Sequence, residues 1–307
     1  MGAGEDTPRL SLGLDIGGTN ITGLVIDGDD RVCASVTLPT RHGEQGLRES
    51  VAAVADAVAS AVGTTPATFA TVGVGLPGIV DQASGDVSHA VNLGIDQTNI
   101  PALLADVFTA PVVAENDVKA TALGIAHVMD DVSDLTYLNI GTGVAVAVIV
   151  GGRLVRGVSN GAGEIGHFSV DAQGEWCACG QRGCLETVTG GRGLWKRLAA
   201  IGADIETLDS DTRPEAVHER ETFIDALCQV AALIAVAYDP AVIALGGGVV
   251  HAAWIHPALV ASLRERATGS PLLTSLAIAD RLRGVPDEVP AGALGAAIVG
   301  RCSWSGA

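Results

Sequence analysis

Residues 10–27 read L-S-L-G-L-D-I-G-G-T-N-I-T-G-L-V-I-D, so that two short apolar runs flank a turn at Asp15–Thr19. Apolar runs on either side of a Gly-rich turn predict a β-hairpin. Glycines at the bend allow backbone N–H groups to approach an anion, as they do in phosphate-binding turns. Taken alone, the stretch fits an ordinary hairpin turn equally well.

The same pattern recurs in residues 136–150, which read T-Y-L-N-I-G-T-G-V-A-V-A-V-I-V. Each copy has an apolar run, a D/N-I-G-x turn and a second apolar run. The turn residues Asn139, Gly141 and Gly143 correspond to Asp15, Gly17 and Thr19. Recurrence at a domain-sized spacing indicates two duplicated halves. Two phosphate-type turns, one in each half, would converge on a nucleotide in a cleft between the halves.

Three cysteines and one histidine lie close together in residues 160–186: His167, Cys177, Cys179 and Cys184. Three thiolates and one imidazole make a Cys₃His set, which completes a tetrahedral structural zinc site. The alternative is a group of buried cysteines beside a surface histidine, but cysteines interrupted by Gly, Gln and Arg are poor core material. Because all four ligand positions are filled, we expect the zinc to brace Glu164 and Glu186 rather than to react.

Residues 111–117 read P-V-V-A-E-N-D, an apolar strand that ends in three polar side chains, and a helix is predicted over 118–129. Carboxylates at the carboxyl end of a strand in an α/β sheet lie where ligands bind. A partly buried carboxylate there can act as a general base toward a hydroxyl. The alternative is that Asp117 caps the helix, and the two roles are compatible.

Gly73, Gly75 and Gly78 match the dinucleotide-binding pattern G-x-G-x-x-G. We reject that interpretation, because Pro77 and the following I-V-D-Q-A-S-G favour a turn and loop over a helix N-terminus. A strand that ends in a bend at Gly78 and lines a cleft is the better prediction. Residues 89–94 are predicted to form a polar loop that contains Asn92.

The remaining pattern predicts helices over 49–62, 100–108, 222–238 and 291–299, with an irregular surface loop over 205–219. Residues 242–250 are predicted to form a strand that runs into Gly246, Gly247 and Gly248. This loop could pass beneath a flat ring such as adenine, or it could be a tight strand–helix connection.

Composition excludes several classes of protein. The 307 residues carry a formal charge of −17 and contain no basic tract, which argues against nucleic-acid binding. Although 48% of the residues are hydrophobic, no uninterrupted apolar run approaches the ~20 residues of a membrane span. The N-terminus shows no signal peptide. With Cys33, Cys228 and Cys302 scattered, the cysteines indicate a reduced, cytoplasmic protein and not a disulfide framework.

Together these motifs resemble the ROK family of bacterial sugar kinases, and glucokinase-like members most of all. The resemblance covers residues 12–299, and the spaced cysteines are its most specific part. The matching motifs are D-I-G-G-T (15–19), G-V-G-L-P-G-I-V-D (73–81), E-N-D (115–117), I-G-T-G (140–143), G-E-I-G-H (163–167), C-A-C-G-Q-R-G-C-L-E (177–186) and L-G-G-G (245–248).

The resemblance implies an actin-like ATPase fold, which is a duplicated, ribonuclease H-like α/β architecture with two lobes around a cleft. We place a smaller N-terminal lobe at 1–117 and a larger lobe, which carries the zinc loop, at 118–307. The closing helix over 291–300 is expected to pack back on the first lobe. The family's usual homodimer, or a higher homo-oligomer, is also implied.

The resemblance further implies ATP with Mg²⁺ as phosphoryl donor and a sugar or polyol as acceptor, most simply glucose converted to glucose 6-phosphate. By position, Asp117 matches the general base, and the sugar contacts match Asn116, Glu164, His167 and Glu186; we add Gly78 and Asn92 to these candidates. The phosphate-binding positions match Gly17, Gly18, Thr19, Gly141, Thr142 and Gly143, with Asp15 close to the metal. We add Asn20, Gly246, Gly247 and Gly248 as nucleotide-binding candidates.

Three residues depart from the usual family pattern: Lys119 replaces Asn, Ile125 replaces Glu and Ile95 replaces Trp. We expect the first two on the helix behind the site and Ile95 in a loop near the sugar. They leave open an N-acylmannosamine, N-acetylglucosamine, fructose or a cyclitol as substrate. A sugar-responsive regulator without catalysis is a more remote alternative, because the first strand begins too early for a DNA-binding helix-turn-helix and the charge opposes DNA.

Overall fold

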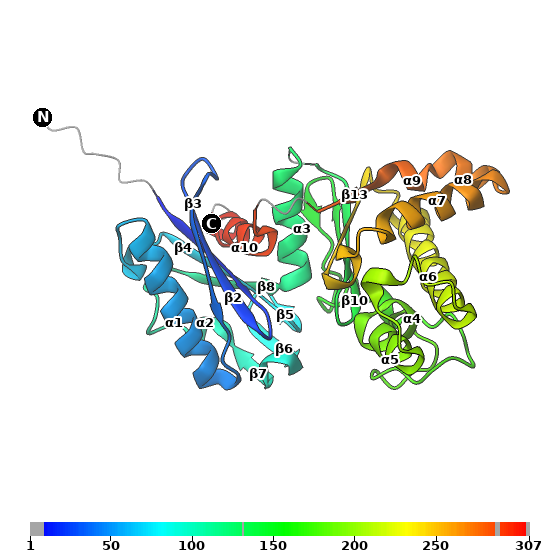
Figure 1. Ribbon diagram of the computed structural model, residues 1–307. Coiled ribbons are helices and arrows are strands. Elements are labelled where there is room, and N and C mark those ends of the chain that lie inside the picture. The colour runs from blue at the N-terminus through cyan, green and yellow to red at the C-terminus, as the bar shows by residue number, and fades with distance from the viewer. Residues whose placement is uncertain (1–8, 131, 286–288, 305–307) are drawn as a thin grey trace, which may run out of the picture. The chain divides into compact units, whose positions relative to one another are not determined.

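The computed structural model describes residues 9–130, 132–285 and 289–304. Residues 1–8, where we predicted no signal peptide, lie outside this part. The chain divides into two compact units, each of which contains a sheet and its helices (Figure 1). The first unit comprises residues 1–131, 156–161 and 286–307, and the second comprises 132–155 and 162–285.

The first unit is built on a five-stranded sheet of order β3-β2-β1-β4-β8. Strand β2 pairs antiparallel with β1 and β3, whereas β1, β4 and β8 run parallel. The predicted hairpin and the predicted strand before Asp117 are therefore both present. The bounds are β1 (Ser11–Ile16), β2 (Asn20–Ile26), β3 (Val32–Pro39), β4 (Thr71–Leu76) and β8 (Val112–Asn116).

A three-stranded antiparallel sheet and six helical segments complete the described part of this unit. Strand β5 follows the bend after β4, so the G-x-G-x-x-G pattern does not open a helix and the dinucleotide interpretation was rightly rejected. The bounds are β5 (Ile79–Asp81), β6 (Asp86–Ala90), β7 (Ile95–Asn99), α1 (Gly43–Ala61), α2 (Ile100–Leu103), α3 (Asp117–Val128), α10 (Ala291–Trp304), η1 (Pro66–Thr68) and η2 (Val91–Leu93).

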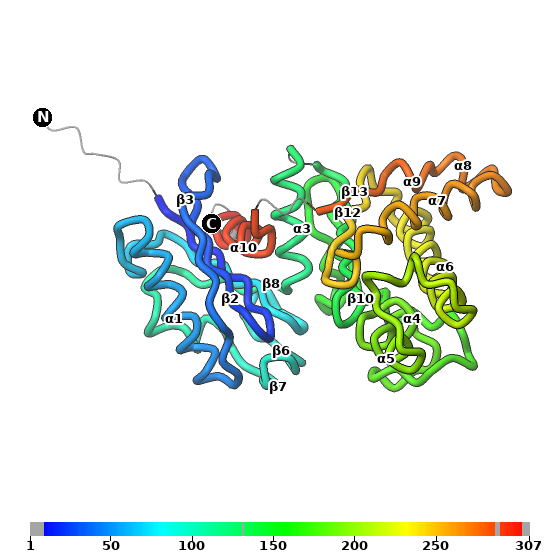
Figure 2. Tube along the Cα trace, in the orientation of Figure 1, coloured from blue at the N-terminus to red at the C-terminus, as the bar shows by residue number. Residues whose placement is uncertain are grey.

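Helix α10 packs directly on the first sheet, against β1, β4 and α3 (Figure 2). Glycine makes this close approach possible. A Cβ on Gly13 would overlap the backbone of α10, and a Cβ on Gly295 would overlap the carbonyl oxygen of Ala120. On the other face, Gly23 leaves room for Val54 of α1. The small-residue sequence of α10 thus allows close packing.

The second unit repeats the pattern of the first, with a five-stranded sheet of order β11-β10-β9-β12-β13. Strand β10 pairs antiparallel with β9 and β11, whereas β9, β12 and β13 run parallel. The two sheets therefore share strand order and direction, which confirms the duplication. The bounds are β9 (Leu135–Ile140), β10 (Val144–Val150), β11 (Arg153–Leu154), β12 (Val242–Gly246) and β13 (Leu282–Gly284).

Helices surround this second sheet. The bounds are α4 (Leu185–Thr189), α5 (Gly191–Ile201), α6 (Pro214–Tyr238), α7 (Ile255–Thr268), α8 (Pro271–Leu276), α9 (Ile278–Arg281), η3 (Ile165–His167), η4 (Ile205–Thr207) and η5 (Gly248–His251). By length and composition α6 could cross a membrane, but half of its most apolar window is buried in the protein. Phe223, Leu227 and Ile234 of α6 have no exposed surface and belong to the core.

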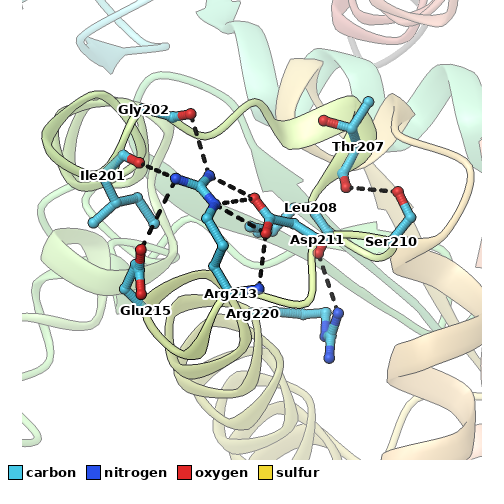
Figure 3. A network of polar contacts seen from close by, with 9 residues as sticks. All are labelled: Ile201, Gly202, Thr207, Leu208, Ser210, Asp211, Arg213, Glu215 and Arg220. Carbon is cyan, nitrogen blue, oxygen red and sulfur yellow. Dashed lines mark hydrogen bonds and ion pairs between the residues drawn. The ribbon is translucent and has the colours of Figure 1, made fainter.

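Two arginines hold the loop that precedes α6 (Figure 3). The guanidinium of Arg213 donates to the carbonyl oxygens of Ile201 and Gly202 at the end of α5, and it pairs with Asp211. Arg220 donates to the carbonyl oxygen of Asp209. The helix begins at Pro214 and not at 222, with proline at the first position, where a missing N–H costs nothing. Our loop prediction over 205–219 was therefore too long.

Other boundaries also differ from the sequence-based expectation. Helix α1 begins at Gly43, six residues before the expected start, and α2 ends at Leu103, well short of 108. The expected loop over 89–94 is divided between the end of β6 and η2. We placed the start of the second half at residue 118, whereas α3 packs on α10 and belongs to the first compact unit.

Candidate functional site

The hairpin turn of the first unit is held from several sides. The Gly17 N–H donates to the Asn20 carbonyl oxygen at 2.9 Å, and Nε2 of His42 donates to the Gly18 carbonyl oxygen at 2.8 Å. A Cβ on Gly18 would lie 3.1 Å from the backbone oxygen of Asn92. The structure therefore brings Asn92 beside the turn. It also adds His42, a residue that no motif had indicated.

Two carboxylates lie near each other at the ends of parallel strands. Asp15 is next to last in β1, and Asp117 directly follows β8. Burial raises the pKa of Asp15 from 3.8 to about 7, and the negative charge of Asp117 raises it further. At the same place α10 carries Gly292, where a Cβ would overlap the carboxyl group of Asp15. Such a pair favours a shared proton or a bound cation over two free negative charges.

Asn116 orients the end of β8. Its Oδ1 accepts from the Lys119 backbone N–H at 3.1 Å and so caps α3. Its Nδ2 donates to the Gly78 carbonyl oxygen at 3.1 Å and to Oδ1 of Asp117 at 3.0 Å. The same Oδ1 accepts from the Val118 backbone N–H at 2.9 Å. Asn116 is therefore the helix cap, and our alternative that Asp117 caps the helix is wrong.

The four predicted metal ligands converge in the second unit. Sγ of Cys179 lies 3.6 Å from Sγ of Cys184, and Sγ of Cys177 lies 3.6 Å from Nδ1 of His167. All four ligand atoms lie within 4.8 Å of one another. A tetrahedral zinc ion with Zn–S bonds of about 2.3 Å separates its sulfur ligands by about 3.8 Å. The donor set and its spacing therefore fit a structural zinc ion.

The local environment of the thiols is consistent with that fit. Burial raises the pKa of Cys184 to about 12, whereas the backbone N–H of Gln181 lowers the pKa of Cys179 to about 7. A cation in the centre of the cluster would ionise a thiol that otherwise keeps its proton. Gly180 and Gly183 have φ angles of 89° and 68°, left-handed conformations that glycine adopts without strain and that let the short loop fold back.

The two ring nitrogens of His167 face different groups. Its Nδ1 faces the cysteines, while its Nε2 lies 3.9 Å from Oε2 of Glu164. One ring nitrogen can therefore ligate a metal while the other is directed toward a carboxylate. Such outer contacts orient a ligating imidazole and fix its tautomer.

Glu186 joins the cysteine loop to the second glycine turn. Its Oε2 accepts from the Val144 backbone N–H at 3.1 Å, and its Oε1 lies 3.9 Å from Sγ of Cys177. The Gly191 N–H, at the start of α5, donates to the Gly141 carbonyl oxygen at 2.8 Å. Glu186, which we expected to be braced by the metal loop and to contact the sugar, thus also holds the turn between β9 and β10.

The second glycine turn and the triple-glycine loop lie together. A Cβ on Gly247 would overlap the carbonyl oxygen of Ile140 and approach Oδ1 of Asn139 at 2.6 Å. Two groups of candidate nucleotide-binding residues thus meet in the second unit: Gly141, Thr142 and Gly143 with Gly246, Gly247 and Gly248. The first unit holds Asp15, Gly17, Gly18, Thr19 and Asn20 on its own hairpin.

The residues that depart from the family pattern are all buried. Ile125 has no exposed surface, and Lys119 is 5% exposed on α3. Ile95 begins β7 and is 3% exposed in the core of the first unit. The expectation that Ile95 lies in a loop is therefore wrong, because the residue belongs to a strand and its side chain packs in the core of the first unit.

Two sheets of identical strand order, each with a glycine turn in its hairpin, define the class of actin-like ATPase folds. Within it, the chain belongs to the ROK family, whose family model matches residues 11–301. The chain is similar to the ROK hexokinase from Thermus thermophilus, whose crystal structure superimposes with a TM-score of 0.81. The two sequences are 30% identical, and the superposition covers 97% of this chain and 100% of that one. The expected fold class is thus confirmed.

Other relatives differ in what their names say they act on. A ROK family glucokinase from Streptomyces griseus, solved with glucose and AMPPNP, is 25% identical, with a TM-score of 0.76 over 95% of this chain and 99% of that one. Among curated proteins, a glucokinase of Halalkalibacterium halodurans is 30% identical over 63% of this chain and 60% of its own length.

A putative xylose repressor of Caldicellulosiruptor is also 30% identical, over 67% of this chain and 53% of its own length. An N-acetylmannosamine kinase of Citrobacter koseri is 32% identical over 60% of this chain and 62% of its own length. The chain therefore spans less than two thirds of the length of these curated relatives.

Proposed function

We propose that the protein is an ATP-dependent kinase that phosphorylates a hydroxyl group of a hexose, with glucose as the favoured substrate. The observation that carries this proposal is the pair of carboxylates in the first unit. Asp117 is held by Asn116 and by the start of α3, while Asp15 keeps a raised pKa beside it. One acid is suited to take a proton from a hydroxyl, and the other to hold a cation.

In this proposal Asp117 is the general base. Oδ1 of Asp117 receives hydrogen bonds from Asn116 and from the Val118 N–H, which fix the orientation of the carboxylate. The carboxylate takes the proton of the sugar hydroxyl as that oxygen attacks the terminal phosphate. Phosphoryl transfer requires mainly positioning and charge neutralisation, so one oriented base is sufficient.

The glycine turns supply the phosphate-binding groups. We assign Gly17, Gly18 and Thr19 in the first unit, and Gly141, Thr142 and Gly143 in the second, to the phosphates of ATP. Asp15 would hold Mg²⁺, which supplies charge neutralisation when it arrives with the nucleotide. Asn20 and the loop of Gly246, Gly247 and Gly248 are assigned to the remainder of the nucleotide.

The metal loop supplies the sugar contacts. Glu164, His167 and Glu186 are assigned to sugar hydroxyls together with Gly78, Asn92 and Asn116. The zinc ion, held by His167, Cys177, Cys179 and Cys184, would brace this loop without joining the reaction. The direction of Nε2 of His167 toward Glu164 supports the coupling of brace and sugar contact.

Two further candidates follow from the relatives. The N-acetylmannosamine kinases among them favour an N-acylated amino hexose as the second substrate candidate. Fructose and cyclitols are further candidates for the acceptor. The repressors among them favour a sugar-binding regulator without catalysis. A cytoplasmic homodimer or larger homo-oligomer completes the proposal, and light scattering on the purified protein measures its mass.

The test is ATP-coupled turnover on a panel of glucose, mannose, fructose, N-acetylmannosamine, N-acetylglucosamine and inositols. We expect the highest kcat/KM for glucose, and we expect Asp117→Asn to lower that activity by about 10²–10⁴. A higher kcat/KM for an amino sugar would change the substrate and keep the mechanism. Sugar binding without turnover on any member of the panel would contradict the kinase and favour the regulator.

A further inference from the structure

Residues 156–161 are an excursion of the chain into the first unit. The residues on either side, 132–155 and 162–285, belong to the second unit. The middle of the excursion contributes little packing, since Gly157 and Ser159 are exposed and Val158 is 106% exposed. Its position on the first unit is therefore not explained by apolar burial.

Polar contacts at the two ends of the segment hold it instead. At one end, Nη2 and Nε of Arg156 lie 2.7 and 2.8 Å from Oε2 of Glu115. Glu115 is only 2% exposed, and its Oε1 accepts from the Asn116 N–H at 3.0 Å. A buried carboxylate without its cation would be strongly unfavourable, so Arg156 is required at this place.

At the other end, Nζ of Lys119 donates to the carbonyl oxygen of Asn160 at 2.6 Å. Lys119 is 5% exposed, which is unusual for a lysine. Asn160 has a φ of 58°, a left-handed conformation that asparagine tolerates better than most residues. The carbonyl is thus turned toward the ammonium group by a specific backbone conformation.

Both contacts originate on residues that flank Asp117. Glu115 precedes it by two positions and Lys119 follows it by two. The segment that they hold ends at Gly161, three residues before Glu164. The same short stretch therefore carries the proposed base and anchors the chain that continues into the G-E-I-G-H motif.

We propose that Glu115–Arg156 and Lys119–Asn160 form a two-point clamp, and that Lys119 and Arg156 are positioning residues for the acceptor substrate. The clamp fixes residues 156–161 to the strand end that carries Asp117, and so it fixes the point from which the motif with Glu164 and His167 begins. Its role in substrate placement rests on the proposed kinase function, whereas its physical existence does not.

The thermodynamics of buried charge separate this role from a purely structural one. A buried ammonium group gains little net stability, and an apolar side chain of similar length is often tolerated as well or better. Lys119→Met removes the ammonium donor from the carbonyl oxygen of Asn160, which lies at the end of an exposed segment. We therefore expect the variant to fold with an unchanged or higher melting temperature, and yet to lose the clamp.

The first experiment is hydrogen–deuterium exchange on the full chain. In Lys119→Met, the amides of residues 156–161 should exchange on the order of tenfold faster than in the unmodified protein, as expected for the loss of one charge-assisted hydrogen bond. Amides of β4 and β8 should keep their rates. The matched control is Lys196→Met, which changes the chain's other lysine, an exposed one, and should alter neither region. Equal exchange in both variants would overturn the clamp.

The second experiment measures sugar and ATP separately. Lys119→Met should raise the KM and the dissociation constant for the sugar on the order of tenfold while the KM for ATP changes less than twofold, and Lys119→Arg should recover part of the loss. Faster exchange without any change in sugar affinity would overturn the positioning role. If the unmodified protein phosphorylates no sugar, the kinase proposal fails, whereas the exchange result still decides on the clamp.

Discussion

Asp15→Asn tests the electrostatics of the site more directly than any other substitution. The carboxyl group of Asp15 has a folded-state pKa of about 7, against an ordinary value of 3.8, chiefly because of burial. Between these two values the folded protein keeps a proton that the unfolded chain releases. Because the unfolded chain binds fewer protons, the free energy of unfolding falls as the pH rises from about 4 to 7.

The size of the effect follows from that difference. Each pKa unit corresponds to about 1.4 kcal/mol, so the full difference corresponds to about 4 kcal/mol lost by pH 7. The side chain of Asp15 keeps some accessible surface, and solvent screening lowers the loss to about 2–4 kcal/mol. Asparagine cannot ionise, so we expect Asp15→Asn to be more stable than the unmodified protein by that amount at pH 7, and nearly equal to it at pH 4.

The assay is urea denaturation of both proteins in steps between pH 4 and 8, with the Asp15 carboxyl followed by ¹³C NMR. The difference between the two free energies of unfolding should grow steadily up to pH 7. Asp117→Asn serves as the control, because it removes only the smaller cause of the raised pKa of Asp15. In that variant the free energy of unfolding should still fall as the pH rises, but less steeply than in the unmodified protein. A difference independent of pH, or an Asp15 resonance that titrates near pH 4, would refute the reasoning.

Three other substitutions test the base, the brace and the packing. Asp117→Asn should lower kcat by about 10²–10⁴ while sugar affinity, measured by calorimetry, changes little; a normal kcat would exclude it as the base. Cys179→Ser should reduce the zinc content measured by mass spectrometry and lower the melting temperature, and native protein free of zinc would end the brace hypothesis. Gly295→Ala forces a Cβ into the carbonyl oxygen of Ala120 and should cost about 3 kcal/mol in denaturation experiments. Gly269→Ala should cost much less, because its Cβ would meet only the carbonyl oxygen of Arg266, at 4.0 Å.

The duplicated sheets could be predicted because both hairpins combine apolar alternation with glycine turns, which are local signals. Helix ends were harder to predict. Helix α6 begins at Pro214, and its first two turns are mostly polar, so the apolar pattern that predicts the helix starts only at 222. The assignment of α3 to the first unit depends on its packing against α10, at the other end of the chain.

The residues of the candidate site also differ in whether a local motif predicts them or only the fold brings them into place. The metal ligands could be predicted because closely spaced cysteines can reach one metal ion within a short loop, and the structure brings the four ligand atoms together. His42 at the first turn and Gly292 beside Asp15 were missed, because neither belongs to a motif and each acts only through the fold. Ile95 was placed in a loop because of its position in a family motif, whereas its apolar side chain begins a strand and packs in the core.

The two hairpin turns share a fold but differ in chemistry, and the difference is informative. Asp15 pairs with Gly75 on the neighbouring parallel strand, and Asn139 pairs in the same way with Gly246. Oδ1 of Asn139 accepts a hydrogen bond from the Tyr137 hydroxyl at 3.2 Å and carries no charge. If both turns serve one triphosphate, a carboxylate in each would add a negative charge that no cation relieves. An amide in the second turn keeps the hydrogen-bonding role of that position, and it leaves the first turn, with Asp15 and Asp117, as the place to which our proposal assigns the cation and the base.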